Sequence, residues 1–211
     1  MQPLLFIDLE TTGLSPAVNA PITVGALVLG GEHDGAVFQG KMRPWDGANI
    51  NAVALQVNGY QFEEIMDWPR PADTFEEFRD FLCDTHPEPL QVHPVGHNVK
   101  FDESFLREWF ITHTDAALYG SLFAPALCTI EVIKQTWPKH HSGAVWPKKG
   151  GLKLTFQYEW HFGTQYEGAH TELADCYATR ALFLHADRES GRNAYAGYHH
   201  LIPKPPMKTP V

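Results

Sequence analysis

Short apolar runs separated by turn residues mark the first part of the chain. Leu4–Leu9, Ile22–Leu29 and Ala36–Met42 are three such runs, and Gly30–Gly35 between the last two is rich in glycine. This pattern predicts three antiparallel strands joined by turns. A further short apolar run, Gln91–Val95, predicts a fourth strand.

Helical spacing of apolar residues predicts most of the remaining elements. Thr74 and Glu77 have the spacing of a capping box, which predicts the start of a helix that buries Phe75, Phe78, Phe81 and Leu82. Further helices are expected at Asn49–Val57, Gln61–Met66, Asp102–His113, Leu127–Trp137, Lys153–Phe162 and Glu172–Asp187. Three strands followed by alternating helices and a strand predict an α/β fold with a mixed central β-sheet flanked by α-helices.

The bulk properties of the chain fit one soluble domain. It has 211 residues, of which 44% are hydrophobic and 19% charged, an ordinary globular balance. We place the domain at residues 1–190 and a proline-rich, extended tail at 191–211. Three widely spaced cysteines argue against a disulfide framework, and no apolar stretch is long enough to span a bilayer. The expected location is the cytoplasm, with no membrane partner.

Net charge bears on the class of ligand. With 25 acidic and 16 basic residues the formal charge is −9, which taken alone disfavours a nucleic-acid-binding protein. That objection weakens if several carboxylates hold metal ions, because bound cations reverse the local sign of the charge.

Carboxylates occur at three places where apolar residues are expected, and the first is a strand. Strand geometry puts Asp8 and Glu10 on the same face as Leu4 and Phe6. Two like charges on that face are costly unless a cation bridges them. A strand end that emerges into solvent would also explain them, so this pair by itself is a weak signal.

The other two acidic positions lie on helices. Asp102 heads the core-facing row of its helix, although an aspartate in a first helical turn is also favoured by the helix macrodipole. Asp175 shares its row with Thr179 and Leu182. His170 precedes Asp175 by five residues, so it can face the same site only from a loop before the helix. Four such carboxylates suit Mg²⁺ or Mn²⁺, and two of these ions can activate a water and stabilise the leaving oxygen of a phosphodiester.

The three acidic segments, taken in order, resemble the exonuclease motifs of the DEDDh family. They are Phe6–Leu14, Gly96–Asp102 and His170-x₄-Asp175, and the similarity extends from residue 3 to about 187. That family includes the proofreading subunit of bacterial replicative DNA polymerase, oligoribonuclease and ribonuclease T. The resemblance implies a ribonuclease H-like exonuclease fold, two Mg²⁺ or Mn²⁺ ions per site, and hydrolysis of nucleic acid from its 3′ end.

The resemblance also implies roles for individual residues. It makes Asp8, Glu10, Asp102 and Asp175 the metal ligands, and His170 the general base. Imidazole suits that task because its ordinary pKa of about 6.5 leaves it largely neutral at neutral pH. Contacts to the terminal nucleotide are implied at Thr11, Thr12, Leu14, His97, Asn98 and Phe101, with core packing as the alternative for Phe101.

Two positions depart from the family pattern. Thr23 stands where relatives often have glutamate, outside the motifs, and Cys128-Thr129 stands where many relatives have Asp-Thr at the start of a helix. The loop Pro138–Gly151 does not align, and it carries Lys148, Lys149 and Trp146. Basic charge beside an aromatic residue is what a flexible nucleic-acid contact needs, whereas a solvated loop with chance lysines is the alternative.

The favoured interpretation is a 3′–5′ exonuclease that releases nucleoside 5′-monophosphates from single-stranded DNA, in proofreading or repair. An exonuclease that trims RNA or short oligonucleotides is the alternative among enzymes, because a small pocket for the 3′ end does not fix the sugar. A non-catalytic nucleic-acid-binding or polymerase-accessory module is the alternative from another class, and the presence of all five catalytic residue types argues against it. A polymerase partner and a homodimer are both left open by the sequence.

Overall fold

A mixed five-stranded sheet forms the centre of the protein. The computed structural model describes residues 3–87, 91–114, 116–140 and 151–204. The strands are Leu4–Thr11 (β1), Pro21–Leu29 (β2), Val37–Lys41 (β3), His93–Gly96 (β4) and Leu127–Cys128 (β5), in the order β3-β2-β1-β4-β5. β1, β2 and β3 pair antiparallel, whereas β4 lies parallel to β1 and β5 parallel to β4. The mixed sheet expected from the sequence is confirmed.

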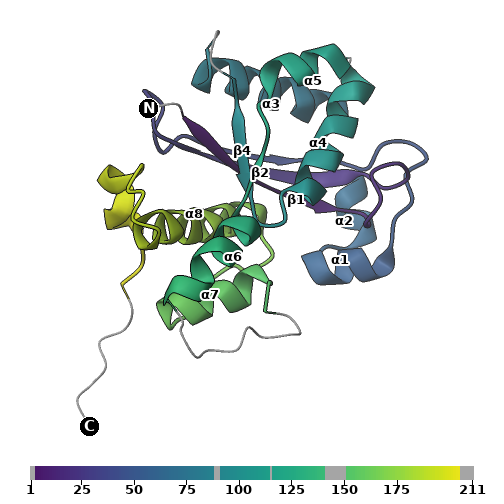
Figure 1. The fold of residues 1–211 in the computed structure, drawn as a ribbon. Coiled ribbons are helices and arrows are strands. Elements are labelled where there is room, and N and C mark those ends of the chain that lie inside the picture. The colour runs from purple at the N-terminus through teal and green to yellow at the C-terminus, as the bar shows by residue number, and fades with distance from the viewer. Residues whose placement is uncertain (1–2, 88–90, 115, 141–150, 205–211) are drawn as a thin grey trace.

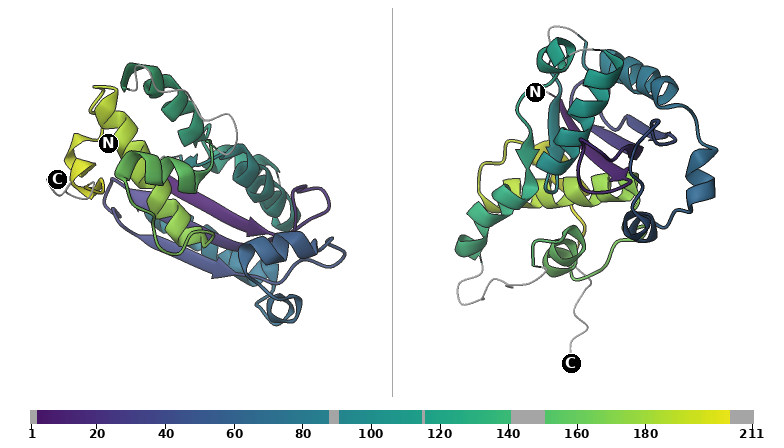
Figure 2. Two further views of the ribbon diagram at one scale, coloured as in Figure 1. Left: turned by 90° about the horizontal axis from the view of Figure 1, so that it is seen from below. Right: turned by 90° about the vertical axis from the view of Figure 1, so that its right-hand side faces the viewer.

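Helices cover both faces of this sheet (Figures 1 and 2). On one face lie α3 (Pro71–Thr85), α4 (Lys100–His113) and α5 (Ala116–Leu122); on the other lie α6 (Thr129–His140), α7 (Leu154–Phe162) and α8 (Glu172–Glu189). The short helices α1 (Ala52–Asn58) and α2 (Phe62–Met66) lie beside the end of β1. A 3-10 helix, η1 (Ala196–Leu201), follows α8.

β1 is buried on both faces, and the alternation of its side chains decides which face carries the acidic residues. Leu5, Ile7 and Leu9 belong to the core shared with α3 and α4. Leu4 and Phe6 belong to the core shared with α8. Because side chains alternate along a strand, the positions of Asp8 and Glu10 continue the face that α8 covers.

Several elements differ from the sequence-based expectations. The prediction that a capping box at Thr74 starts the helix was wrong. α3 starts earlier, at Pro71, because proline is well suited to the first helical position. The Thr74 hydroxyl instead donates to the carbonyl of Lys41 on β3 at 2.9 Å. Leu127 and Cys128 form a strand rather than the start of a helix, and α5 was not foreseen.

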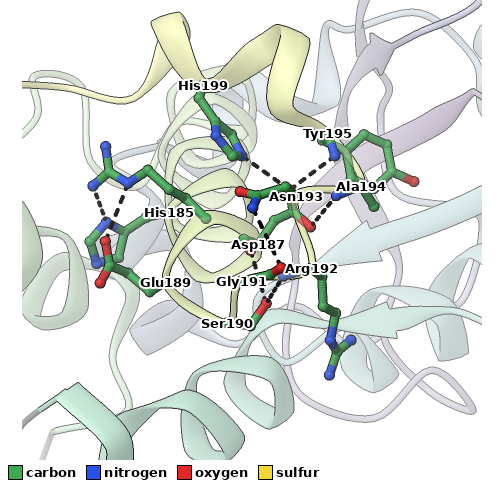
Figure 3. A network of polar contacts seen from close by, with 11 residues as sticks. His185, Asp187, Glu189, Ser190, Gly191, Arg192, Asn193, Ala194, Tyr195 and His199 are labelled. Carbon is green, nitrogen blue, oxygen red and sulfur yellow. Dashed lines mark hydrogen bonds and ion pairs between the residues drawn. The ribbon is translucent and has the colours of Figure 1, made fainter.

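The packed part of the chain continues beyond residue 190, where the sequence had suggested a tail. Buried Asp187 accepts hydrogen bonds from the backbone N–H groups of Ala194 and Tyr195, at 3.1 and 2.9 Å, and lies 3.0 Å from Nε2 of His199 (Figure 3). Ile202 is buried in the α8 core. Residues 205–211, the rest of the expected tail, lie outside the described residues. In the described ranges no helix is long and apolar enough to cross a membrane.

Candidate active site

Three carboxylates from two elements meet over β1. Asp8, Glu10 and Asp175 each offer an oxygen atom within 4.8 Å of the others. In the antiparallel ladder Asp8 is paired with Gly25 and Glu10 with Thr23. Asp175 reaches the same place from the first turn of α8, which packs against β1 and β2.

Asp102 lies beside this trio and is held there by the sheet. β4 pairs with β1 only from Leu4 to Phe6, so the edge of β1 beyond that point is open on the β4 side. The N–H of Leu9 donates across this gap to Oδ1 of Asp102 at 3.0 Å. Asp102 is 4% exposed, and its charge raises the pKa of Asp8 more than any other charge does.

Burial and repulsion by neighbouring carboxylates raise the pKa values of all four carboxyl groups. Burial is the largest cause in each case. The pKa of Asp8 lies well above its ordinary value, and that of Asp175 is also raised. The pKa of Glu10 is raised to about 8, and that of Asp102 to about 7 although its bond to Leu9 acts in the opposite direction. Carboxylates that are buried, as Asp102 and Asp175 are, or partly buried, as Asp8 and Glu10 are, and that repel their neighbours form a donor set suited to a hard divalent cation, which would stabilise their ionised forms.

Tyr166 is a partner of this cluster that sequence reasoning missed. Its phenol donates a hydrogen bond to Oδ1 of Asp175 at 2.8 Å, and the backbone N–H of His170 donates to the same oxygen at 3.4 Å. Both bonds lower the pKa of Asp175, against the larger effect of burial. No spacing rule connects Tyr166 to Asp175, since the chain reverses between them.

His170 lies in the turn before α8, as its spacing required. Gly168, with φ of +77°, makes the reversal possible, and the N–H and hydroxyl of Thr171 both donate to its carbonyl, at 2.9 and 2.6 Å. His170 itself has φ of +68°, a conformation that L-residues seldom adopt. The turn brings its backbone to Asp175 and leaves its side chain exposed. Its role as the base remains a prediction.

Thr11 and Thr12, which were predicted to bind the terminal nucleotide, make hydrogen bonds within the segment that follows β1. The Thr11 hydroxyl donates to the carbonyl of Gly13 at 2.6 Å. The Thr12 hydroxyl donates to the carbonyl of Asn49 at 2.8 Å and accepts from the N–H of Ala20 at 2.9 Å. Both threonine side chains therefore stabilise the turn, whereas Leu14 is 83% exposed and free to contact a ligand.

The residues of the second motif, Gly96–Asp102, differ in what they contact. The ring nitrogens of His97 lie 2.8 Å from the Thr129 hydroxyl and 2.5 Å from the Leu152 carbonyl, and burial lowers the pKa of the ring. Asn98 is exposed and has φ of +70°. Phe101 is half-buried and packs on Phe105 at 5.0 Å between ring centroids. The predicted contacts Lys148 and Lys149 lie outside the described residues.

A group of side chains on the α1–α2 side of the site was also missed. The Asn58 amide donates to the carbonyl of Thr11 at 3.0 Å, which ties α1 to the end of β1. The pKa of Tyr60 is raised to about 12, by burial first and then by the charges of nearby Glu172 and Glu10. The Lys41 amine lies 5.2 Å from the centre of the Tyr60 ring. These contacts join residues far apart in the chain, and no motif marks them.

Comparison with known proteins identifies the family. The sequence model of the exonuclease family RNase_T matches residues 5–183. This chain belongs to that exonuclease family. It is 32% identical to Ribonuclease T from Hahella chejuensis over 108 residues, and this aligned region covers 47% of this chain and 50% of that protein. It is 29% identical over 105 residues to the 3′-5′ DNA exonuclease Cap18 from Escherichia coli, covering 49% and 54%.

The fold is shared with larger nucleases. A structure of E. coli exonuclease I in complex with a dT13 oligonucleotide matches with a TM-score of 0.74 and 20% identity, over 95% of this chain and 44% of that chain. A product-bound structure of exonuclease I matches with a TM-score of 0.73 and 21% identity, over 91% and 45%. The ribonuclease H-like exonuclease fold is thus confirmed. The chain spans about half the length of the curated relatives it matches and less than half of these structures.

Proposed function

We propose that this protein is a metal-dependent 3′–5′ exonuclease that hydrolyses single-stranded DNA from its 3′ end. The observation that carries the proposal is the meeting of Asp8, Glu10 and Asp175, with one oxygen of each within 4.8 Å of the others. Two Mg²⁺ or Mn²⁺ ions would be held by these three residues together with Asp102. When bound, such ions activate a water and stabilise the leaving oxygen of a phosphodiester.

The remaining chemistry belongs to the residues of the chain. His170 accepts a proton from the attacking water, whose oxygen forms a bond to the terminal phosphorus. The bond from that phosphorus to the 3′ oxygen of the preceding nucleotide breaks, and this oxygen takes up a proton. The products are a nucleoside 5′-monophosphate and a strand shortened by one residue. The exposed Leu14 side chain packs on the terminal base in this scheme.

RNA is the second candidate substrate. The observation that favours it is the relative named Ribonuclease T, whereas the relative named 3′-5′ DNA exonuclease and the dT13 complex favour DNA. A cytoplasmic location also belongs to the proposal, and the three free thiols are compatible with a reducing compartment.

The test is digestion of matched oligonucleotides labelled at the 5′ end. Single-stranded DNA and RNA of one sequence, each with a free or a phosphorylated 3′ end, are incubated with Mg²⁺, Mn²⁺ or EDTA. The expected result is a ladder of products shortened stepwise from the free 3′ end of DNA, abolished by EDTA. Asp8→Asn, shown to be folded by circular dichroism, controls for contaminating nucleases and should be inactive. Internal cleavage, metal-independent cleavage, or no cleavage of either polymer would refute the proposal.

A further inference from the structure

A fifth carboxylate lies at the edge of the candidate metal centre. Glu172 is the first residue of α8 and is 1% exposed. A Cβ atom on Gly25 would lie 2.7 Å from the carbonyl carbon of Glu172 and 2.8 Å from its Cγ, so α8 can begin here only because residue 25 has no side chain. In the sheet Gly25 is paired with Asp8 on one side and Gln39 on the other. Glu172 therefore packs over β2, between the strands that carry these two residues.

The two carboxylate oxygens of Glu172 are in different situations. Oε1 accepts a hydrogen bond from the Gln39 amide at 2.7 Å. Oε2 is buried and, within the described residues, has no hydrogen-bond partner. Leaving a buried acceptor unpaired costs about 1–3 kcal/mol, and more when the group is charged. If this position served packing alone, the folded protein would be more stable with a side chain that lacks this oxygen.

A second unpartnered oxygen lies on the same face of β2. Thr23 is fully buried, two residues before Gly25 and paired with Glu10, and its hydroxyl also lacks a partner among the described residues. Two buried oxygens without partners thus accompany the acidic residues of β1. Glu172 is close enough for its charge to raise the pKa values of Glu10 and Asp8. Because Gly25 is paired with Asp8 and Thr23 with Glu10, both unpartnered oxygens belong to residues beside the acidic positions of β1, where a cation and its water would satisfy several groups at once.

We propose that Glu172 is a fifth carboxylate of the metal centre, which strengthens cation binding through its charge and its unpartnered oxygen. This inference rests on the proposed metal-dependent function. Glu172 packs over Gly25 of β2 rather than over β1, and its Oε1 is already bonded to Gln39, so it acts through water rather than as a direct ligand. Mg²⁺ keeps several of its waters in protein sites, and groups that bind such waters typically change metal affinity by about 10–100-fold.

Cation binding without nucleic acid tests this role directly. Mn²⁺ is titrated into metal-free wild type, Glu172→Gln, Glu103→Gln and Asp8→Asn, and free Mn²⁺ is measured by electron paramagnetic resonance. Glu103 is the matched control, because it also lies in the first turn of a helix, next to Asp102, but is outside the carboxylate trio. We expect a rise in Kd of about 10-fold or more for Glu172→Gln and no change for Glu103→Gln. Thermal melting without metal should show Glu172→Gln to be more stable than wild type, since a repelling charge is removed.

The possible outcomes separate this inference from the one on which it rests. Wild-type affinity in Glu172→Gln, with binding lost in Asp8→Asn, would overturn the role of Glu172 and leave the metal centre in place. A lower melting temperature in metal-free Glu172→Gln at unchanged Kd would mean that the residue only supports the start of α8. Failure of the wild type to bind Mn²⁺ would overturn the metal centre itself, and the role of Glu172 with it.

Discussion

Glu10 offers a direct measure of how burial, and then repulsion by neighbouring carboxylates, disfavours ionisation in the metal-free cluster. Its pKa is about 8 in the folded protein against an ordinary 4.5. The folded state therefore keeps a proton that the unfolded chain loses between these values. The contribution to stability is fully present below about pH 4.5 and is lost as the pH rises towards 8. In the absence of metal, wild type should thus become less stable from weakly acidic to weakly alkaline pH.

The size of the effect follows from the proton balance. One proton bound in excess by the folded state changes stability by about 1.4 kcal/mol per pH unit, which gives roughly 4–5 kcal/mol by pH 8 as an upper bound. Glu10 is partly exposed, and solvent screening reduces this figure, so we expect roughly 2 kcal/mol. For a domain of this size that corresponds to about 4–8 °C in melting temperature. Residue 10 of the Glu10→Gln variant cannot ionise, so the variant should lack the part of this dependence that Glu10 contributes.

Thermal melting of EDTA-treated proteins from pH 5 to 8.5 measures the difference. The melting temperature of Glu10→Gln should rise above that of wild type progressively with pH. Glu63→Gln, which removes an exposed charge on α2, should follow wild type throughout. Added Mn²⁺ should stabilise wild type most at the alkaline end, because ionised carboxylates bind the cation. Parallel curves for wild type and Glu10→Gln would refute the reasoning, since Glu10 would then have the same pKa in the folded and unfolded chains.

Four further changes test other parts of the molecule. His170→Ala should lower kcat by roughly 10²–10⁴-fold with little change in KM, as expected for loss of a general base; near-normal turnover would contradict that role. Tyr166→Phe should weaken Mn²⁺ binding by roughly 10-fold, because Asp175 loses a donor that orients it; unchanged affinity would make the contact incidental. Asp187→Ala should destabilise the protein by about 2–4 kcal/mol in urea unfolding while leaving kcat intact, because its partners lie in the segment after α8. Changing Lys148 and Lys149 to glutamate should flatten the plot of log affinity against log salt by about 0.7 per lost phosphate contact; an unchanged slope would exclude them from binding.

The positions of the acidic residues could be predicted because each follows from local geometry. Period two along β1 puts Asp8 and Glu10 on one face whatever lies above it. The row that leads from Asp175 to Thr179 and Leu182 on α8 is buried, as helical spacing required. The same spacing excluded His170 from the helix, and the structure places it in the preceding turn. These conclusions needed no knowledge of the strand register.

The contacts that complete the site could not be predicted in the same way. The bond from Leu9 to Asp102 exists because β4 stops pairing with β1 after Phe6, and a sequence does not reveal where a ladder ends. Glu172 shares a helix face with Asp175, three residues away, which was a usable signal. Its bond to Gln39, however, depends on the register of three strands and on the space left by Gly25.

Cations bound at the proposed site would also weaken the argument that the net charge makes against nucleic-acid binding. Two divalent cations would offset four of the nine net negative charges, and they would do so at the place where a phosphate must bind. The Lys41 amine lies 4.7 Å from the centre of the Trp68 ring and 5.2 Å from that of Tyr60, whose pKa responds to Glu10 and Glu172. A positive charge and two aromatic rings thus lie near the proposed metal centre, which is the combination that single strands bind. Under the proposed function, attraction for nucleic acid is local to the end of the strand, and a protein with a net charge of −9 needs no wholly basic face to bind it.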